Sequence, residues 1–186
     1  MAELLLRKTT AKQVQQVFDK FIELFPNAVT LKNSDTRSIK HVIRSLGMEH
    51  IRAPLLKKIA TMLVEKYGGR VPSSESELKA LPGVGQYTAN AVLNLAYGHE
   101  LPLVDTNAIR VATRVFGFAP RKKRARDDKV IWLEFQKMLP KGNVREFNLG
   151  LIDFASKVCL PRKPECPSCF AFTYCNYAQK VYYKMT

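Results

Sequence analysis

Apolar residues recur at helical spacing along almost the entire chain, and this periodicity constrains the fold more than any other feature of the sequence. A repeat of about 3.6 residues gives each helix one apolar stripe, which has to be buried against another element. The predicted helices cover about 14–22, 39–46, 55–67, 87–96, 106–115, 130–138 and 146–157. No segment alternates like a half-buried strand, so the sequence predicts an all-α protein.

Glycine, proline and capping residues separate these helices. A glycine pair at 68–69 ends the third helix, and Ser74 followed by Glu77 matches a capping box that begins a short helix. That helix is predicted to stop at the LPGVG segment, residues 81–85. The basic run RKKRAR at 121–126 is interpreted as a solvated loop or the start of a helix.

The chain carries 30 lysine and arginine residues against 16 acidic residues, which gives a formal net charge of +14. This excess favours a polyanionic partner, with nucleic acid as the first interpretation and a membrane surface as the second. No apolar run approaches the roughly 20 residues of a membrane-spanning helix. The N-terminal segment MAELLLRKTT has too short an apolar core for a signal peptide, so we expect an intracellular protein.

The first informative motif is LPGVGQYTANAVL, which begins at Leu81. Two glycines after a proline permit a very tight turn between helices and a close approach by another backbone. We expect Gly83, Val84 and Gly85 to bind a DNA phosphate, with the amides of Val84, Gly85 and the next helical turn free to donate. A plain Pro-Gly turn between two core helices is the alternative.

A second motif, LPLVDTNAIRVATR, places Asp105 after an apolar run and directly before a helix. Asp105 is either a helix N-cap or a buried carboxylate that faces a cleft. In the second interpretation it stabilises the positive charge that develops on a sugar as a glycosidic bond breaks, and it orients or deprotonates water. Asn107 is then expected to hold the sugar or the water, and the preceding hairpin favours this interpretation.

All four cysteines lie in one short segment with the spacing C-x6-C-x2-C-x5-C: Cys159, Cys166, Cys169 and Cys175. In a reducing compartment this favours metal ligation over disulfides, and four thiolates in so short a loop suit a [4Fe–4S] cluster. Zinc is the alternative. Arg162 and Lys163 lie in the same loop, either as cations that reach DNA phosphates or as an exposed solubilising pair.

The hairpin, the aspartate motif and the cysteine spacing, in this order, resemble the endonuclease III superfamily of DNA glycosylases over essentially the whole chain. The resemblance implies an all-α protein of two lobes. Residues 1–100 are expected to form a six-helix barrel lobe with the helix-hairpin-helix, and residues 101–186 a helical lobe with the iron–sulfur cluster loop. Double-stranded DNA is expected to bind across the cleft between the lobes, with the target base flipped into it.

Within the superfamily, the segments ELLLRKTT, LPGVGQYTANAV, VDTNAIRV and REFNLGLIDF are similar to the archaeal-type mismatch thymine glycosylases. This likeness implies hydrolysis of the N-glycosidic bond of thymine or uracil mispaired with guanine. Members that also cut the DNA backbone carry a lysine that forms a Schiff base with the sugar, where this chain has Tyr87. We therefore expect a monofunctional enzyme with Tyr87 in its base pocket. The alternative is that Tyr87 only packs the barrel.

The resemblance assigns further residues near the target base. Glu3 aligns with a glutamate that is catalytic in the adenine glycosylases and lies in the pocket of the thymine branch. Arg7 and Lys8 fall where relatives carry residues that enter the duplex, and Met48 falls where they place a hydrophobic wedge. Surface cations and a core methionine are the alternatives. Relatives carry an additional N-terminal segment before the equivalent of Glu3, so we expect Glu3 to be held less firmly here.

Two other functions are compatible with the sequence. An adenine glycosylase acting opposite 8-oxoguanine would share the fold and the cluster, but such enzymes carry an extra C-terminal domain, for which the few residues after Cys175 leave no room. A non-catalytic DNA-binding module would bind DNA with strong salt dependence and release no base. Because relatives act as monomers and hydrolysis needs no electron transfer, we expect a monomer with a structural cluster.

Overall fold

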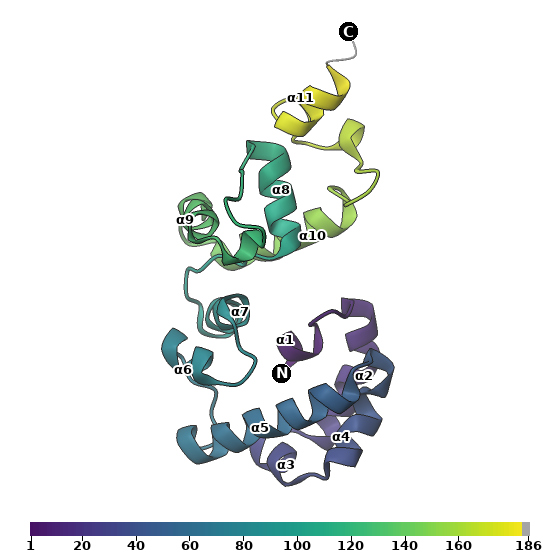
Figure 1. Ribbon diagram of the computed structural model, residues 1–186, viewed down its shortest axis with the longest axis vertical. Helices are drawn as coiled ribbons and strands as arrows, with labels where there is room; N and C mark the ends of the chain where they lie inside the picture. Colours follow the sequence, from purple (N-terminus) through teal and green to yellow (C-terminus); the bar gives the residue numbers. More distant parts are fainter. Residues whose placement is uncertain (184–186) are drawn as a thin grey trace. The chain divides into compact units, whose positions relative to one another are not determined.

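The computed structural model describes residues 1–183, and within this range it contains α-helices and short 3₁₀ turns but no β-strand (Figure 1). This confirms the predicted all-α fold. The α-helices are α1 (Ala2–Leu5), α2 (Ala11–Leu24), α3 (Ala28–Asn33), α4 (Thr36–Ile43), α5 (Glu49–Tyr67), α6 (Glu75–Ala80), α7 (Gln86–Tyr97), α8 (Thr106–Phe116), α9 (Lys129–Met138), α10 (Val144–Lys157) and α11 (Asn176–Tyr182). The 3₁₀ turns are Arg44–Leu46, Ala125–Asp127 and Cys166–Ser168.

The chain divides into two compact units, Met1–Leu93 and Asn94–Thr186. The division falls inside α7, whereas the sequence placed a boundary after residue 100, beyond the end of that helix. Each unit has buried apolar residues of its own. The assignment of a barrel lobe and a cluster lobe to these units stays a prediction.

In the first unit the long helix α5 packs against α3 and α4, and α2 packs against α4 (Figure 1). Helix α5 begins at Glu49, earlier than predicted, and contains Pro54. A proline inside a helix removes one backbone hydrogen bond, but its neighbours Ala53 and Leu56 are fully buried. Packing against the core therefore keeps α5 continuous through Pro54. The sequence alone predicted that this helix begins only after the proline, at residue 55.

In the second unit α8 is the central helix. It packs against α10 and α11, and its apolar residues belong to two buried clusters. One cluster includes Ile109 and Phe135 of α9, and the other includes Val115 together with buried cysteines. Two faces of α8 are therefore buried. Its polar residues lie at the N-terminus of the helix and along one stripe that includes Arg110 and Arg114.

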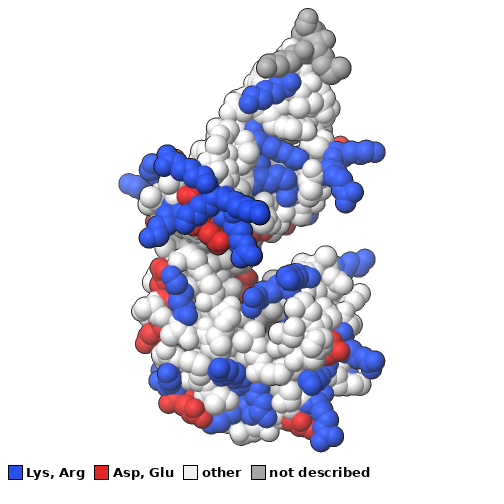
Figure 2. Space-filling model, viewed as in Figure 1, with Lys and Arg blue, Asp and Glu red and all other residues white. Residues whose placement is uncertain are grey.

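The basic run at 121–126 forms an exposed loop that ends in a 3₁₀ turn, and Lys and Arg side chains gather around α9 in Figure 2. Asp128 is buried beneath this loop, and its carboxylate accepts hydrogen bonds from the amides of Arg121 (2.6 Å) and Val130 (3.0 Å). The Arg121 amide, with help from that of Val130, holds the pKa of Asp128 below its usual value. Within the described residues no helix is long and apolar enough to cross a membrane.

Candidate functional site

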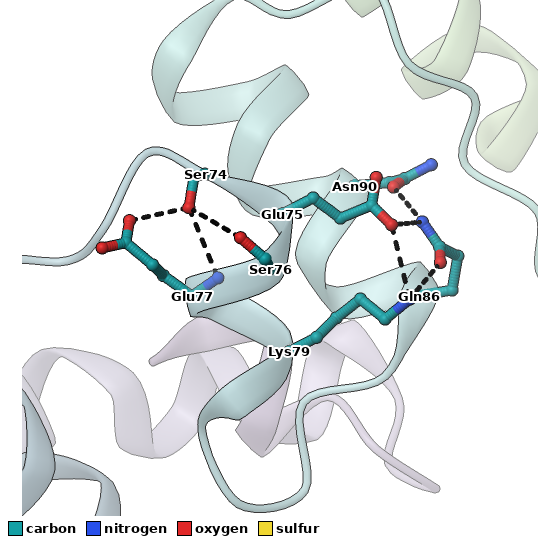
Figure 3. A network of polar contacts seen from close by, with 7 residues as sticks. All are labelled: Ser74, Glu75, Ser76, Glu77, Lys79, Gln86 and Asn90. Carbon is teal, nitrogen blue, oxygen red and sulfur yellow. Dashed lines mark hydrogen bonds and ion pairs between the residues drawn. The ribbon is translucent and has the colours of Figure 1, made fainter.

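The helix-hairpin-helix lies in the first unit, between α6 and α7 (Figure 3). Ser74 caps α6 as predicted, since its hydroxyl accepts a hydrogen bond from the Glu77 amide (3.3 Å). The hydroxyl also donates to the Glu77 carboxylate (2.7 Å), so Glu77 bonds to the Ser74 side chain. Across the turn, Gln86 Nε2 donates to Glu75 Oε1 (3.0 Å) and Lys79 Nζ donates to Gln86 Oε1 (2.9 Å). These contacts tie the two helices together on either side of the hairpin.

The two glycines of the hairpin differ in their surroundings. Gly83 has φ +75°, and a Cβ there would lie 3.1 Å from Nη1 of Arg7 and 3.2 Å from Cδ2 of Leu55. Gly85 has no heavy atom within 4 Å of such a Cβ and does not have a positive φ. Gly83 is therefore required by the protein itself, whereas Gly85 is open toward a ligand.

The amides of the hairpin are only partly free. The amide of Val84 donates to the carbonyl of Leu81 (3.1 Å), because the four-residue turn closes on itself. The prediction that the Val84 amide is free to bind phosphate is therefore wrong. No described residue accepts a hydrogen bond from the exposed amide of Gly85, which leaves this group available to an anion at the start of α7.

A pocket of about 140 Å³ in the first unit brings together Arg7, Lys8 and Met48, the three residues that the resemblance placed near the flipped base. All three side chains are exposed at its rim. Nη1 of Arg7 also donates to the carbonyl of Gly83 (3.3 Å), so the pocket adjoins the hairpin. The structure thus places residues 7, 8 and 48 side by side, although the last is far from the others in sequence.

Three residues other than glycine have a left-handed backbone within the described range, and all three were predicted to contact DNA. Lys8 and Met48 each have φ +56°, and Lys163 has φ +51°. This conformation costs a residue with a Cβ roughly 1–2 kcal/mol. Such strain persists where the surrounding structure enforces it, and it is frequent at functional sites.

Glu3 and Tyr87 are both half-buried in the first unit. Glu3 lies on α1, where burial raises the pKa of its carboxyl above the usual value and the nearby N-terminal ammonium partly offsets this. Tyr87 lies in the first turn of α7, directly after the hairpin. A carboxyl with a raised pKa can serve as a hydrogen-bond donor at a higher pH than an exposed glutamate.

Asp105 lies in the second unit and is the N-cap of α8, with Oδ1 accepting from the Ala108 amide (2.7 Å). Its other oxygen, Oδ2, accepts from Nδ2 of Asn107 (2.9 Å), and Oδ1 of Asn107 accepts from Nη1 of Arg110 (2.8 Å). The N-cap interpretation is confirmed, and the side chain is half-buried rather than buried. Capping leaves catalysis possible, since each carboxylate oxygen has a second lone pair and the helix N-terminus favours its charge.

Two arginines one turn apart on α8 hold the segment that leads into the cysteine loop. Arg110 donates to two backbone carbonyls at 2.8 and 3.0 Å, and Arg114 donates to two more at 2.6 and 2.9 Å. The acceptors are Ala155 and Cys159 for Arg110, and Leu160 and Pro161 for Arg114. Arg110 therefore connects Asp105, through Asn107, to the loop that carries the exposed pair Arg162 and Lys163.

The four cysteines line one pocket in the second unit, and none forms a disulfide. Burial raises the pKa of the Cys166 thiol, and the other three cysteines raise it further, which reflects their proximity. The sulfur of Cys159 accepts a hydrogen bond from Arg114 (3.5 Å), and that of Cys169 accepts one from the Ala171 amide (3.4 Å). Among residues 1–183 no three side chains of His, Cys, Asp or Glu lie close enough together to hold one metal ion. The donor set of four cysteines nevertheless fits the ligand requirement of an iron–sulfur cluster.

Sequence reasoning gave no role to Arg52, Arg110 or Arg114. A usable signal was present for Arg52, because it lies at helical spacing from the buried residues Leu56 and Ile59 of α5. A cation at a largely buried position needs acceptors close by. Such residues therefore mark places where a helix holds an irregular segment of backbone.

The helical fold and the hairpin with its free amide are those of a helix-hairpin-helix protein. The family follows from the match of residues 1–134 to the model described as "HhH-GPD superfamily base excision DNA repair protein". The chain belongs to this family.

Two relatives represent the two kinds of glycosylase considered from the sequence. The chain is 43% identical over 183 residues to a protein of Pyrobaculum aerophilum named "Thymine/uracil-DNA glycosylase", covering 97% of this chain and 80% of the relative. It is 32% identical over 169 residues to an "Adenine DNA glycosylase" of Buchnera aphidicola, covering 91% of this chain but 48% of that protein. The likeness to the thymine branch is thus both higher and more complete.

A solved structure gives the same result for the fold. The "structure of a thermostable thymine-DNA glycosylase" matches with a TM-score of 0.91 at 37% identity, covering 96% of this chain and 82% of the other. The predicted membership of the endonuclease III-type glycosylases, and the likeness to their thymine branch, are confirmed.

Proposed function

We propose that this chain hydrolyses the bond between deoxyribose and a thymine or uracil mispaired with guanine. The observation that carries the proposal is the carboxylate of Asp105, fixed at the N-terminus of α8 by the Ala108 amide and by Asn107. A mispaired base is cheaper to extrude from the duplex than a paired one, which supplies selectivity before any contact to the base. The enzyme is proposed to act as a monomer, inside the cell, on double-stranded DNA.

The proposed reaction needs one carboxylate. The bond between C1′ and the base nitrogen breaks, its electron pair leaves with the base, and positive charge develops on the sugar. The carboxylate of Asp105 stabilises this charge and then accepts the proton of the water that adds to C1′. Asn107 keeps the carboxylate oriented, because it holds one of the two oxygens while leaving that oxygen a lone pair.

Tyr87 and Glu3 are proposed to contact the target base, and Asn107 is proposed to hold the sugar or the water. The phenol of Tyr87 cannot form a Schiff base with the sugar, so the product is an abasic site in an intact strand. The raised pKa of Glu3 keeps its carboxyl protonated to a higher pH, which suits a donor to a carbonyl oxygen of the base.

The backbone of the DNA is proposed to contact two places. The hairpin is the first, where the free amide of Gly85 and the start of α7 receive a phosphate. The exposed pair Arg162 and Lys163 forms the second. Arg7, Lys8 and Met48 are proposed to enter the duplex beside the extruded base.

The four cysteines, Cys159, Cys166, Cys169 and Cys175, are proposed to hold a [4Fe–4S] cluster. When bound, such a cluster cross-links the segments that supply its ligands. Arg114 prepares the segment by fixing its backbone and by donating to the Cys159 sulfur. A broad visible absorbance band, with iron and sulfide in the purified protein, would support the cluster. Zinc alone, without that band, would contradict it.

The proposed function is tested by base excision from a T·G duplex, using the wild-type protein and Asp105→Asn, with and without alkali. We expect strand breaks with wild type after alkali only, because an abasic site is alkali-labile. Asp105→Asn should excise at least about a thousandfold more slowly while binding the duplex with unchanged affinity.

Each other outcome identifies what is wrong. Breaks without alkali would contradict a monofunctional enzyme, and normal excision by Asp105→Asn would contradict the mechanism. Excision of adenine opposite 8-oxoguanine, in place of thymine, would favour the adenine glycosylase. Tight, salt-sensitive binding without release of any base would favour a non-catalytic module.

A further inference from the structure

Arg52 on α5 is the only buried cation within residues 1–183, with 7% of its surface exposed. Its guanidinium donates to the carbonyls of Leu5 (2.6 Å) and Arg7 (2.6 Å) and to the hydroxyl oxygen of Thr9 (2.5 Å). No ion pair of the described residues includes it. All three of these side-chain hydrogen bonds therefore go to one segment, residues 5–9.

Two acceptors of Arg52 flank Lys8, which has a left-handed backbone. The same arginine is also bonded to Met48, the other left-handed residue of the pocket, since the amide of Arg52 donates to the Met48 carbonyl (2.9 Å). Lys8, Met48 and Arg52 line the same pocket. Arg52 thus connects the two strained residues: its side chain bonds to both neighbours of Lys8, and its backbone amide bonds to Met48.

We propose that Arg52 is a positioning residue for base extrusion: it fixes Lys8 and Met48 in the relative placement with which they enter the duplex. The inference rests on the proposed function, because it concerns how that enzyme holds a base outside the helix. The planar guanidinium suits this task, since it presents several donors in a rigid arrangement. A lysine has one nitrogen and does not reach three acceptors on a segment of this length.

A purely structural role for Arg52 predicts something different. If Arg52 only stabilised the fold, its loss would lower the melting temperature and reduce every activity in proportion to the folded fraction. A positioning role predicts a selective loss, because displacing an inserting side chain by about 1 Å can cost on the order of a hundredfold in rate while phosphate contacts elsewhere maintain the affinity.

The test measures extrusion separately from cleavage. The duplex carries 2-aminopurine, a base whose fluorescence rises when stacking is lost, next to a T·G mismatch. The protein is Asp105→Asn, which is expected to bind without cleaving. We expect a fluorescence rise with this parent protein, and a rise smaller by roughly tenfold when Arg52→Met or Arg52→Lys is added. Thr9→Val removes one acceptor and should give a smaller reduction.

Affinity and folding are measured on the same proteins. Binding by anisotropy should change by less than about threefold in Arg52→Lys, since the backbone contacts to DNA are retained. Arg37→Met is the matched control, because it removes one positive charge from an exposed arginine of the same unit, and it should leave the fluorescence rise unchanged. If Arg52→Met does not fold, Arg52→Lys decides.

The outcomes separate the inference from the proposed function. A full fluorescence rise in both folded Arg52 variants overturns the inference alone. A reduction of the same size in Arg37→Met, or one explained by the unfolded fraction, also overturns it. No rise even with the Asp105→Asn parent overturns base extrusion itself, and with it both proposals.

Discussion

A single arginine holds the irregular segment of the first unit, whereas two arginines share the corresponding task in the second. Arg52 on α5 binds residues 5–9, while Arg110 and Arg114 on α8 bind the segment at 155–161. None of the three takes part in an ion pair of the described residues. In each unit a guanidinium donates to carbonyls in or just after the last turn of a helix.

The difference lies in what else each arginine reaches. Arg52 connects two strained residues that are proposed to touch DNA, whereas Arg110 connects its segment to Asn107 and thereby to Asp105. Arg114 contacts the segment, the Cys159 sulfur and the ring of Tyr177 (4.8 Å). The second unit therefore divides two functions between neighbouring residues: Arg110 serves the aspartate and Arg114 serves the cysteines.

Among the variants that test this comparison, the largest effect is expected for Arg110→Met. Asn107 loses the bond from Arg110 that holds its side chain, so Oδ2 of Asp105 is held less firmly. Single-turnover excision should therefore fall by about a hundredfold with little change in DNA affinity. Arg145→Met, which removes an exposed arginine of the same unit, is the control and should excise at the normal rate. Normal excision by Arg110→Met would show that Asp105 needs no support from the segment at 155–161.

A smaller and different effect is expected for Arg114→Met. Two charged hydrogen bonds to carbonyls are lost, so the free energy of unfolding should fall by about 2 kcal/mol and the melting temperature by roughly 4–8 °C. Excision below the melting range should stay close to wild type. Thermal unfolding followed by circular dichroism measures this. If Arg114→Met slowed excision as much as Arg110→Met, the proposed division of functions on α8 would be wrong.

The smallest effects are expected at the two glycines of the hairpin. Substitution of Gly83 should change stability, whereas substitution of Gly85 should change DNA affinity. Gly83→Ala forces a Cβ into a left-handed residue against Arg7 and Leu55, so unfolding should become easier by about 1–2 kcal/mol. Gly85→Ala meets no protein atom and should leave stability unchanged. It should weaken DNA binding by about 1 kcal/mol, roughly fivefold in Kd.

Melting curves and binding isotherms of both glycine variants, measured side by side, check this difference. Equal destabilisation by the two substitutions would show that Gly85 is also required by the fold. Unchanged DNA affinity of Gly85→Ala would remove the hairpin from the proposed interface.

Much of the local structure was predictable. The caps at Ser74 and Asp105 and the stop at Gly68 follow from side chains and backbone preferences that act within one turn of helix. The helices α1, α3 and α11 were not predicted, because helices this short contain too few residues for an apolar repeat to be recognised. The early start of α5 was missed because Pro54 resembles a boundary until its buried neighbours are known.

The candidate site shows the same limit. Motif spacing was enough to propose Asp105, Asn107 and the four cysteines as candidates, because each motif lies in one short stretch of the chain. It did not reveal that the Val84 amide is occupied, since that depends on how the turn closes.

By itself, the sequence determined the helical fold, the hairpin, the position of the capping aspartate and the likeness to a glycosylase family, because these depend on periodicity and on contacts between residues close in the chain. Only the tertiary structure decided that Arg52 joins Lys8 to Met48 and that Arg110 joins Asp105 to the segment at 155–161. The physical reason is that a buried guanidinium must find acceptors wherever the fold brings carbonyls within reach, and those carbonyls lie some forty-five residues away in sequence.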